Sequence, residues 1–162
     1  MTVRRACQLD LPAILAIENR EILEGYAHFG TVPLTLDQVR ANFEAAGDQY
    51  PWFVAEDEEV VGFARCSPHR ARESYRWTVE TGIYVAPGHQ GKGVGRSLYD
   101  PLFANLKEFG VRTVLAGISL PNPASVKLHE SFGMEHVGTF PAVGFKNGRW
   151  IDVGYWALHW PD

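Results

Sequence analysis

The chain has 162 residues, 46% of them hydrophobic, and its 15 Lys+Arg against 19 Asp+Glu give a formal net charge of −4 at pH 7. This length suits about one domain, residues 1–162, in which folding buries about 70% of the surface of the unfolded chain. The negative balance argues against a general affinity for nucleic acid or for anionic membranes. We therefore expect a globular protein that binds neither.

The cysteines and the N-terminal segment indicate the cellular compartment in which we expect the protein. The chain has only two cysteines, Cys7 and Cys66, and these have no metal-ligand spacing with each other or with the histidines. Two isolated cysteines fit a reducing compartment better than a disulfide framework. The N-terminus has no apolar signal region, and no window approaches the roughly 18 uncharged apolar residues of a membrane-spanning helix. These features predict a cytoplasmic protein without a metal, an export signal or a membrane span.

Strand and helix periods alternate along the first part of the chain. Periodicity, capping residues and turn residues predict a strand at 2–6, helices at about 10–25 and 35–47, and a hairpin of strands at 52–55 and 60–64 around the acidic turn 56–59. Asp10 followed by Pro12 favours the start of the first helix, and Gly25 and Gly47 favour the two helix ends.

The second part of the chain continues the alternation without a repeat. The same criteria predict a strand at 75–85, a helix at about 92–109, a strand at 113–118, a short helix at 125–132, and strands at 135–140 and 150–158 joined by a turn at 146–149. Short connections and regular alternation indicate one α/β unit.

The segment from Gln90 to Arg96 carries the clearest chemical signal. Gly91, Gly93 and Gly95 stand between a strand and an amphipathic helix, so backbone N–H groups are exposed next to a helix N-terminus. This arrangement favours a phosphate or pyrophosphate, although such a turn can also serve only close packing of helix on sheet. It lacks the Gly-Lys-Ser/Thr ending of a P-loop, and its spacing is a poor match to a dinucleotide-binding fingerprint.

This segment resembles the central motif of the GCN5-related N-acetyltransferase (GNAT) family, Q/R-x-x-G-x-G/A, which is matched by Gln90, Gly93 and Gly95. The resemblance implies the single-domain GNAT fold, an α/β fold with a mixed, mostly antiparallel sheet of about seven strands and about four flanking helices. It also implies acetyl-CoA as co-substrate. The residues that it assigns to coenzyme binding are Ile83, Tyr84, Val85, Gln90, Gly91, Lys92, Gly93, Val94, Gly95, Arg96, Asn122 and Ser125.

Further segments are similar to the phosphinothricin acetyltransferase subgroup, over about residues 3–158. They are Tyr50 to Trp52, Arg70 to Arg72, Trp77 to Glu80, Leu120 to Asn122, Ser125 to Glu130 and Gly148 to Gly154. This resemblance implies acetylation of the α-amino group of a small amino acid or analogue of the phosphinothricin, methionine sulfoximine or methionine sulfone type. It also implies a homodimer in which the C-terminal strands pair the subunits.

Two titratable residues are candidates for moving protons. Glu80 lies in the middle of a predicted strand, on the face opposite Val79 and Ile83, where it could be a general base or only the ion-pair partner of an arginine. His129, on the short helix after Asn122, could transfer a proton near neutral pH or simply be solvated on that helix. Both match catalytic positions of the subgroup, and the sequence leaves open which of them is the general base.

The candidates for acceptor binding are Phe29, Arg72 and Tyr75. Arg72 belongs to an arginine-rich stretch that could be a solvated loop or could bind the anionic group of an acceptor through a bidentate guanidinium. The first loop, Leu23 to Thr31, departs from the Thr/Ser-rich run of herbicide-resistance members, which leaves the acceptor open.

The sequence therefore predicts an acetyl-CoA-dependent N-acetyltransferase in which the amine attacks the thioester directly within a ternary complex. The alternatives are acetylation of another small amine or of a protein N-terminus, and a non-catalytic acetyl-CoA-binding module. The module would keep the glycine loop but would not need Glu80 or His129.

Overall fold

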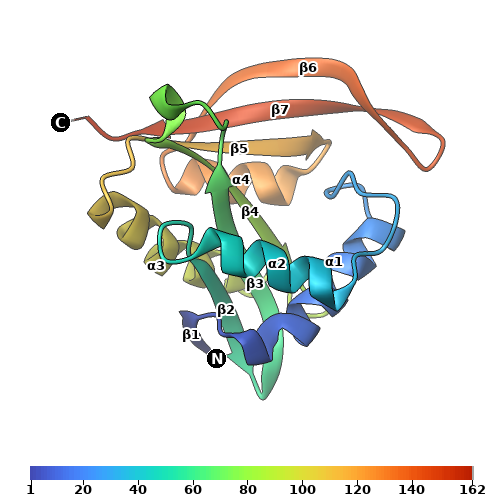
Figure 1. Ribbon diagram of the computed structural model, residues 1–162. Helices are drawn as coiled ribbons and strands as arrows, with labels where there is room; N and C mark the ends of the chain where they lie inside the picture. The colour runs from blue at the N-terminus through green and yellow to red at the C-terminus, as the bar shows by residue number, and fades with distance from the viewer. Residues whose placement is uncertain (162) are drawn as a thin grey trace.

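The computed structural model describes residues 1–161 as a seven-stranded mixed sheet with helices on both faces (Figure 1). The order across the sheet is β1-β2-β3-β4-β5-β7-β6, and of these pairs only β4–β5 is parallel. The strands are β1 (Thr2–Arg5), β2 (Trp52–Asp57), β3 (Glu59–Pro68), β4 (Thr78–Val85), β5 (Thr113–Leu120), β6 (Glu135–Lys146) and β7 (Arg149–His159). The predicted GNAT-type α/β architecture is confirmed.

Four α-helices and two short 3₁₀ helices connect the strands. They are η1 (Gln8–Asp10), α1 (Leu11–Glu24), α2 (Leu36–Ala46), η2 (Glu73–Tyr75), α3 (Val94–Glu108) and α4 (Pro123–Ser131). The N-caps of α2 and α4 are Thr35 and Asn122, whose side chains accept hydrogen bonds from the backbone N–H groups of Gln38 and Ser125. Among residues 1–161, no helix is long and apolar enough to cross a membrane.

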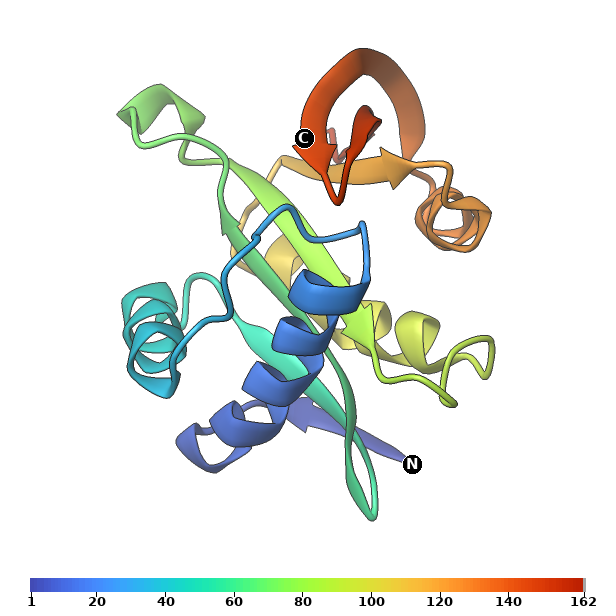
Figure 2. The same cartoon turned by 90° about the vertical axis from the view of Figure 1, so that its right-hand side faces the viewer.

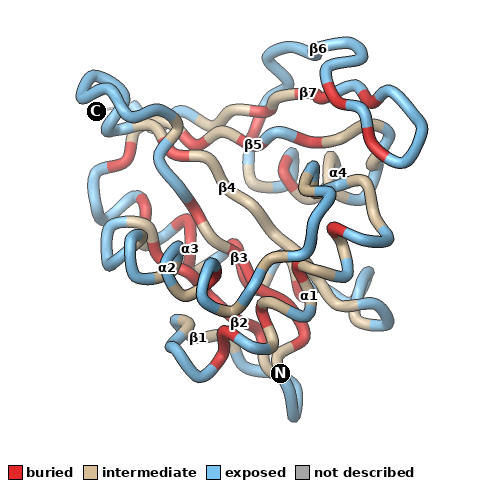
Figure 3. The backbone as a smooth tube through the Cα atoms, turned by 45° about the vertical axis from the view of Figure 1, so that its right-hand side comes forward, coloured by how far each residue is buried: buried red, intermediate tan, exposed pale blue. Residues whose placement is uncertain are grey.

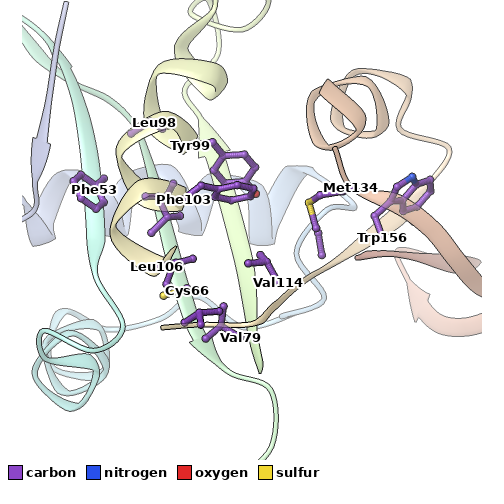
Figure 4. Close-up of a cluster of buried hydrophobic side chains, with 14 of the residues drawn as sticks. Phe53, Cys66, Val79, Leu98, Tyr99, Phe103, Leu106, Val114, Met134 and Trp156 are labelled. Atoms are coloured by element: carbon purple, nitrogen blue, oxygen red, sulfur yellow. The ribbon is translucent and has the colours of Figure 1, made fainter. Parts of the chain in front are cut away.

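Two hydrophobic clusters hold the helices on the sheet. The larger one joins α3 to the strands through Leu98, Leu102 and Leu106, which pack with Cys66 and Val79 (Figure 4). The smaller one joins α1 and α2 to the sheet through Leu11, Ile14, Val39, Trp52 and Phe63. Apolar residues at a spacing of three or four on each helix therefore dictate which side is buried.

The sheet forks between β4 and β5. Their parallel ladder has only three pairs, and the last one joins Glu80 to Leu115. Beyond it the two strands diverge, and β5 continues alongside β7 (Figure 2). The sheet is therefore open between β4 and β5 beyond this pair, and Glu80 stands where the opening begins.

The structure differs from the predicted elements at three places. The segment Glu73–Tyr75 is a 3₁₀ turn, so the strand predicted from residue 75 begins only at Thr78. β3 continues to Pro68, because its last residues pair with the start of β4. β6 continues to Lys146 across two register shifts, and most of its residues are exposed (Figure 3). Such irregular, solvent-facing pairing leaves little periodicity in the sequence.

Candidate active site

The glycine loop between β4 and α3 forms a cradle of exposed backbone. Gly88, Gly91 and Gly93 have φ values of +84°, +72° and +82°, and an added Cβ at each would meet nothing within 4 Å. Glycine adopts this left-handed region without steric cost, so the loop presents its N–H groups to open space. Gly93 is also the N-cap of α3, whose positive end faces the same space. This cradle suits the pyrophosphate of a nucleotide-containing coenzyme.

A cavity of about 740 Å³ extends from this loop between the N-termini of α3 and α4 and the last turns of α1; we call it the coenzyme cavity. All coenzyme-binding candidates except Lys92 line it: Ile83, Tyr84, Val85, Gln90, Gly91, Gly93, Val94, Gly95, Arg96, Asn122 and Ser125. An added Cβ at Gly95 would lie 2.9 Å from Leu128 Cδ2, so glycine lets α3 approach α4 here. The sequence did not predict that α1 also lines the cavity, through Ile17, Arg20, Glu21 and Glu24.

Three further cavities surround the fork of the sheet. The fork cavity, of about 250 Å³, is lined by Arg65, Ser67, Glu80, Thr81, Gly82, Tyr84, Gly117 and Tyr155. The hairpin cavity, of about 610 Å³, is lined by His69, Arg70, Glu80, Leu115, Val137, Gly138, Thr139, Phe140 and Tyr155. The loop cavity, of about 540 Å³, is lined by Ala27, His28, Phe29, Gly30, Tyr84, Gly117, Ser119, Phe140, Val143, Val153 and Tyr155.

Tyr84 and Tyr155 connect these spaces. Tyr155 lines all three cavities at the fork, and Tyr84 lines the fork, loop and coenzyme cavities. Burial raises the pKa of Tyr84 to about 12, so its hydroxyl stays protonated at neutral pH. A coenzyme in the large cavity and an acceptor at the fork would therefore meet beside Tyr84.

Glu80 is positioned at this meeting point by the strand register. It is opposite Ser67 of β3 and forms the last pair with β5. Its carboxylate borders both the fork cavity and the hairpin cavity and is 36% exposed. A half-buried carboxylate open to two cavities is available to accept a proton from a bound molecule.

A buried ion-pair network lies behind the fork. Glu18 of α1 is fully buried, Arg65 Nη1 donates to Glu18 Oε2 at 3.1 Å, Arg65 Nη2 contacts Oε1, and His28 Nε2 lies 3.1 Å from Oε1. Burial alone would raise the pKa of Glu18, but the hydrogen bonds and charges of His28 and Arg65 outweigh it, and the pKa is lowered. The sequence signal is a carboxylate four residues from both Ile14 and Ile22, on the apolar stripe of the helix. The network neutralises Arg65.

His129 is placed differently from Glu80. It is 3% exposed, and it lines none of the four cavities described above. Its Nδ1 donates to the Ser125 carbonyl at 2.7 Å, and its Nε2 lies 2.8 Å from the Tyr99 hydroxyl. Burial lowers the pKa of His129. Tyr99 lies 3.3 Å from Thr81 Oγ1, so a chain of hydroxyls joins His129 to the fork cavity.

The three acceptor-binding candidates have separate positions. Phe29 lines the loop cavity, and its ring packs on β6, where an added Cβ at Gly144 would lie 2.4 Å from Phe29 Cε2. Arg72 is exposed at the N-cap of η2 and lines none of the four cavities, because the chain turns there instead of continuing as a strand. Tyr75 makes an edge contact with His69, at 5.4 Å between ring centroids, and lines none of the four cavities. The arginine that lines that cavity is Arg70.

Comparisons with known proteins agree with this geometry. The family model "Acetyltransferase (GNAT) family" matches residues 16–134. The chain is 42% identical to a phosphinothricin N-acetyltransferase of Streptomyces viridochromogenes over 95% of this chain and 85% of that protein. It is 38% identical to an L-methionine sulfoximine/L-methionine sulfone acetyltransferase of Salmonella typhimurium over 98% of this chain and 94% of that protein.

Solved structures show the same relationship. The acetyltransferase YncA of Salmonella typhimurium, solved with its cofactor acetyl-CoA, superposes with a TM-score of 0.94 at 36% identity over 98% of this chain and 92% of that one. A phosphinothricin acetyltransferase of Sinorhizobium meliloti, in complex with acetyl-CoA, superposes with a TM-score of 0.94 at 35% identity over 98% of this chain and 87% of that one. The glycine cradle, the forked sheet and these matches together show that the chain belongs to the GNAT acetyltransferase family.

Proposed function

We propose that this protein is an acetyl-CoA-dependent N-acetyltransferase that acetylates the α-amino group of a small amino acid or analogue of the phosphinothricin, methionine sulfoximine or methionine sulfone type. The observation that carries the proposal is the junction at Tyr84, which lines both the coenzyme cavity and the fork cavity that Glu80 borders. The named relatives act on amines of this type. Two cavities that meet at one point suit direct transfer within a ternary complex.

The loop and two helix N-termini would hold the coenzyme. N–H groups around Gly91 and Gly93 would donate to the pyrophosphate, and backbone of Ile83 to Val85, which β5 leaves unpaired beyond the fork, would bind the pantetheine arm. Acetyl-CoA supplies the activated acetyl thioester. An N–H of the β4 backbone next to the thioester oxygen would stabilise the negative charge that develops there.

Glu80 is proposed as the general base. Its carboxylate takes a proton from the acceptor ammonium, and the amine nitrogen then forms a bond to the acetyl carbon as the carbon–sulfur bond breaks. His129 has both ring nitrogens bonded within the protein, so its proposed part in proton movement is indirect, through the Tyr99 hydroxyl toward Thr81.

Arg70 is proposed to bind the anionic group of the acceptor, the role that the sequence suggested for Arg72. Arg70 lines the hairpin cavity beside Glu80, whereas Arg65 is paired with buried Glu18. A guanidinium binds a carboxylate or phosphinate through two parallel hydrogen bonds. The positive charge of Arg70 beside the base favours acceptors that carry an anionic group over cationic polyamines.

A homodimer formed through the C-terminal hairpin and a cytoplasmic location complete the proposal. Large apolar side chains are exposed on β6 and β7: Val137, Phe140, Val143, Phe145 and Trp150. An apolar group of this kind on one hairpin is typical of a protein–protein interface.

The proposed cytoplasmic location is supported by the cysteines. Cys7 and Cys66 are both free thiols, as in proteins of reducing compartments.

The function is tested with acetyl-CoA as the acetyl donor. The acceptors are L-methionine sulfone, L-methionine sulfoximine, phosphinothricin and a panel of free amino acids. Wild type should release CoA with at least one of them, and Glu80→Gln should lower kcat by about 10²-fold or more, because it removes the base. Glu73→Gln is the matched control, since Glu73 is an exposed carboxylate paired with Arg76. Tight acetyl-CoA binding without turnover of any amine would instead indicate a coenzyme-binding module.

A further inference from the structure

His69 faces Glu80 across the β3–β4 ladder. Ser67 is the pairing partner of Glu80, and His69, two residues further, donates its backbone N–H to the Thr78 carbonyl at 3.3 Å. Residues two apart on a strand share a face, so His69 and Glu80 are diagonal neighbours on the side that borders the cavities. Side chains of this length can meet across such a diagonal.

The two side chains are in contact. His69 Nδ1 lies 3.2 Å from Glu80 Oε1, with the imidazole 20% and the carboxylate 36% exposed. A carboxylate only accepts hydrogen bonds, so the proton of the imidazole is on Nδ1. The edge contact with Tyr75 fixes the ring from the other side. Both members of the pair line the hairpin cavity, beside Arg70.

We propose that His69 is a positioning residue for Glu80, and this assignment rests on the proposed function. The Nδ1–H group holds Oε1 and so fixes the rotation of the carboxylate, which leaves Oε2 for the amine of the acceptor. In the proton transfer, an N–H bond of the ammonium breaks and an O–H bond forms at Oε2, while His69 keeps its own proton. The pair converts a rotatable carboxylate into a base with one defined direction.

Three substitutions at His69 separate hydrogen bonding from packing. His69→Phe keeps a ring for the contact with Tyr75 but removes the N–H donor. His69→Asn places an amide N–H close to the position of Nδ1 and restores a donor to Glu80. His69→Leu removes the donor without adding bulk, and it replaces His69→Phe if the larger side chain prevents folding. His159→Phe is the control, because His159 is exposed on β7 and bonds only to Thr113 among the described residues.

The assay measures acetyl-CoA turnover by wild type and variants with the amine of the panel above that wild type acetylates fastest. We expect His69→Phe to lower kcat about tenfold with the KM for acetyl-CoA within about twofold of wild type, and His69→Asn to recover most of that loss. His159→Phe should behave as wild type. A kcat for His69→Phe and His69→Leu within about twofold of wild type would overturn the proposal.

A double-mutant cycle with Glu80→Gln distinguishes this role from general support of the fold. If His69 acts through the carboxylate, adding His69→Phe to Glu80→Gln should change kcat by less than about twofold, because the group that it orients is already gone. An equal loss in both backgrounds would show a structural role and overturn the assignment. A wild type that acetylates no amine would overturn the proposed function, and this assignment with it, whereas an active wild type unaffected by His69→Phe overturns only the assignment.

Discussion

His129 and Glu80 were suggested by one resemblance, yet the structure gives them opposite surroundings. Glu80 borders two cavities, whereas His129 is buried between Ser125 and Tyr99. A histidine that donates through Nδ1 and accepts at Nε2 is neutral. Protonation would turn Nε2 into a second donor, facing the Tyr99 hydroxyl, and would place a charge in the core. Burial disfavours that charge and lowers the pKa of His129.

The pH dependence of stability should report this burial. The pKa of His129 is lowered from an ordinary value of 6.5, so at pH 7.5 the residue is neutral in both the folded and the unfolded chain. As the pH falls below 6.5, the unfolded chain takes up a proton before the folded one, and the free energy of unfolding decreases by up to about 1.4 kcal/mol per pH unit. Urea unfolding between pH 5 and pH 8 measures this slope.

The comparison variant is His129→Gln, which lacks the titrating group and should flatten the slope below pH 6.5. The carboxylates of Asp10 and Glu18 also have lowered pKa values, from ordinary values of 3.8 and 4.5, so their contributions are lost only at more acidic pH. His159→Gln should retain the wild-type slope. An unchanged slope in His129→Gln would contradict the buried, neutral assignment.

At the scale of secondary-structure elements, α3 has a glycine in the left-handed conformation at each end, and the two glycines have different surroundings. Gly93 at the start has φ +82° beside the coenzyme cavity, and Gly110 after the end has φ +83° near Trp77. The helix end at Gly110 is a common C-terminal arrangement. Strain from an added side chain is therefore similar at the two glycines, but of the two only Gly93 borders the coenzyme cavity.

Gly93→Ala and Gly110→Ala form a matched pair. Each should lower the free energy of unfolding by about 1–2 kcal/mol, because alanine is strained at positive φ. Gly93→Ala alone should raise the KM for acetyl-CoA, by about tenfold, since its loop no longer directs its N–H groups at the pyrophosphate. Steady-state kinetics at varied acetyl-CoA concentration measure the difference. An equal KM in the two variants would argue against pyrophosphate binding at this loop.

Lys146 connects the last hairpin to the first helix. At the end of β6, its buried ammonium donates to the carbonyls of His28, at 2.6 Å, and Glu21, at 3.3 Å. Burial lowers the pKa of Lys146. The lysine thus joins the loop that carries Phe29 to the strand against which Phe29 packs, and holds two walls of the loop cavity together.

Lys146→Met should weaken the contact between the end of β6 and the loop that carries Phe29. The part-buried carbonyl of His28 loses its donor, so we expect a loss of about 1–3 kcal/mol in unfolding free energy and a severalfold rise in the KM of the acceptor. The KM for acetyl-CoA should change little. Lys107→Met is the control, because Lys107 is exposed on the last turn of α3. An acceptor KM equal to that of the control would show that the contact does not shape the acceptor site.

At the scale of the whole molecule, the β6–β7 hairpin exposes a group of large apolar side chains. Phe145 is 58% and Trp150 67% exposed, and the two rings lie against each other with centroids 5.0 Å apart. Water-exposed aromatic pairs of this kind are favourable to bury in an interface. The hairpin also supplies Phe140, Val143 and Tyr155 to the proposed acceptor cavities, so dimerisation there would stabilise one wall of the site.

Phe145→Glu should therefore shift the protein toward a monomer, because it places a charge in the proposed apolar interface. Sedimentation equilibrium over a range of protein concentrations measures the association constant, and we expect a decrease of about tenfold or more. Leu9→Glu is the control, since Leu9 is 90% exposed far along the chain from the hairpin. A wild type that sediments as a monomer, or a Phe145→Glu variant with unchanged association, would remove this hairpin as the interface.

Local chemistry explains which parts of the fold and the site were predictable. The glycine loop follows from residues adjacent in sequence, and all of its predicted coenzyme contacts except Lys92 line the cavity. The 3₁₀ turn at Glu73–Tyr75 and the long β6, with its two register shifts, have no regular hydrophobic period, so periodicity misplaced the limits of these elements. The same turn moves Arg72 out to solvent and leaves Arg70 in the cavity.

The sequence by itself determined the family, the order of strands and helices, the glycine cradle and the placement of Glu80 on the outward face of its strand, because each depends on spacing along one segment. Only the tertiary structure decided which partner each polar or charged side chain contacts. Glu18 contacts Arg65 and His28, Lys146 contacts the carbonyls of Glu21 and His28, and His69 contacts Glu80. These contacts join separate elements, and the cost of burying a charge selects the partner that can reach it. The fork between β4 and β5 then brings the coenzyme cavity and the fork cavity together beside Tyr84.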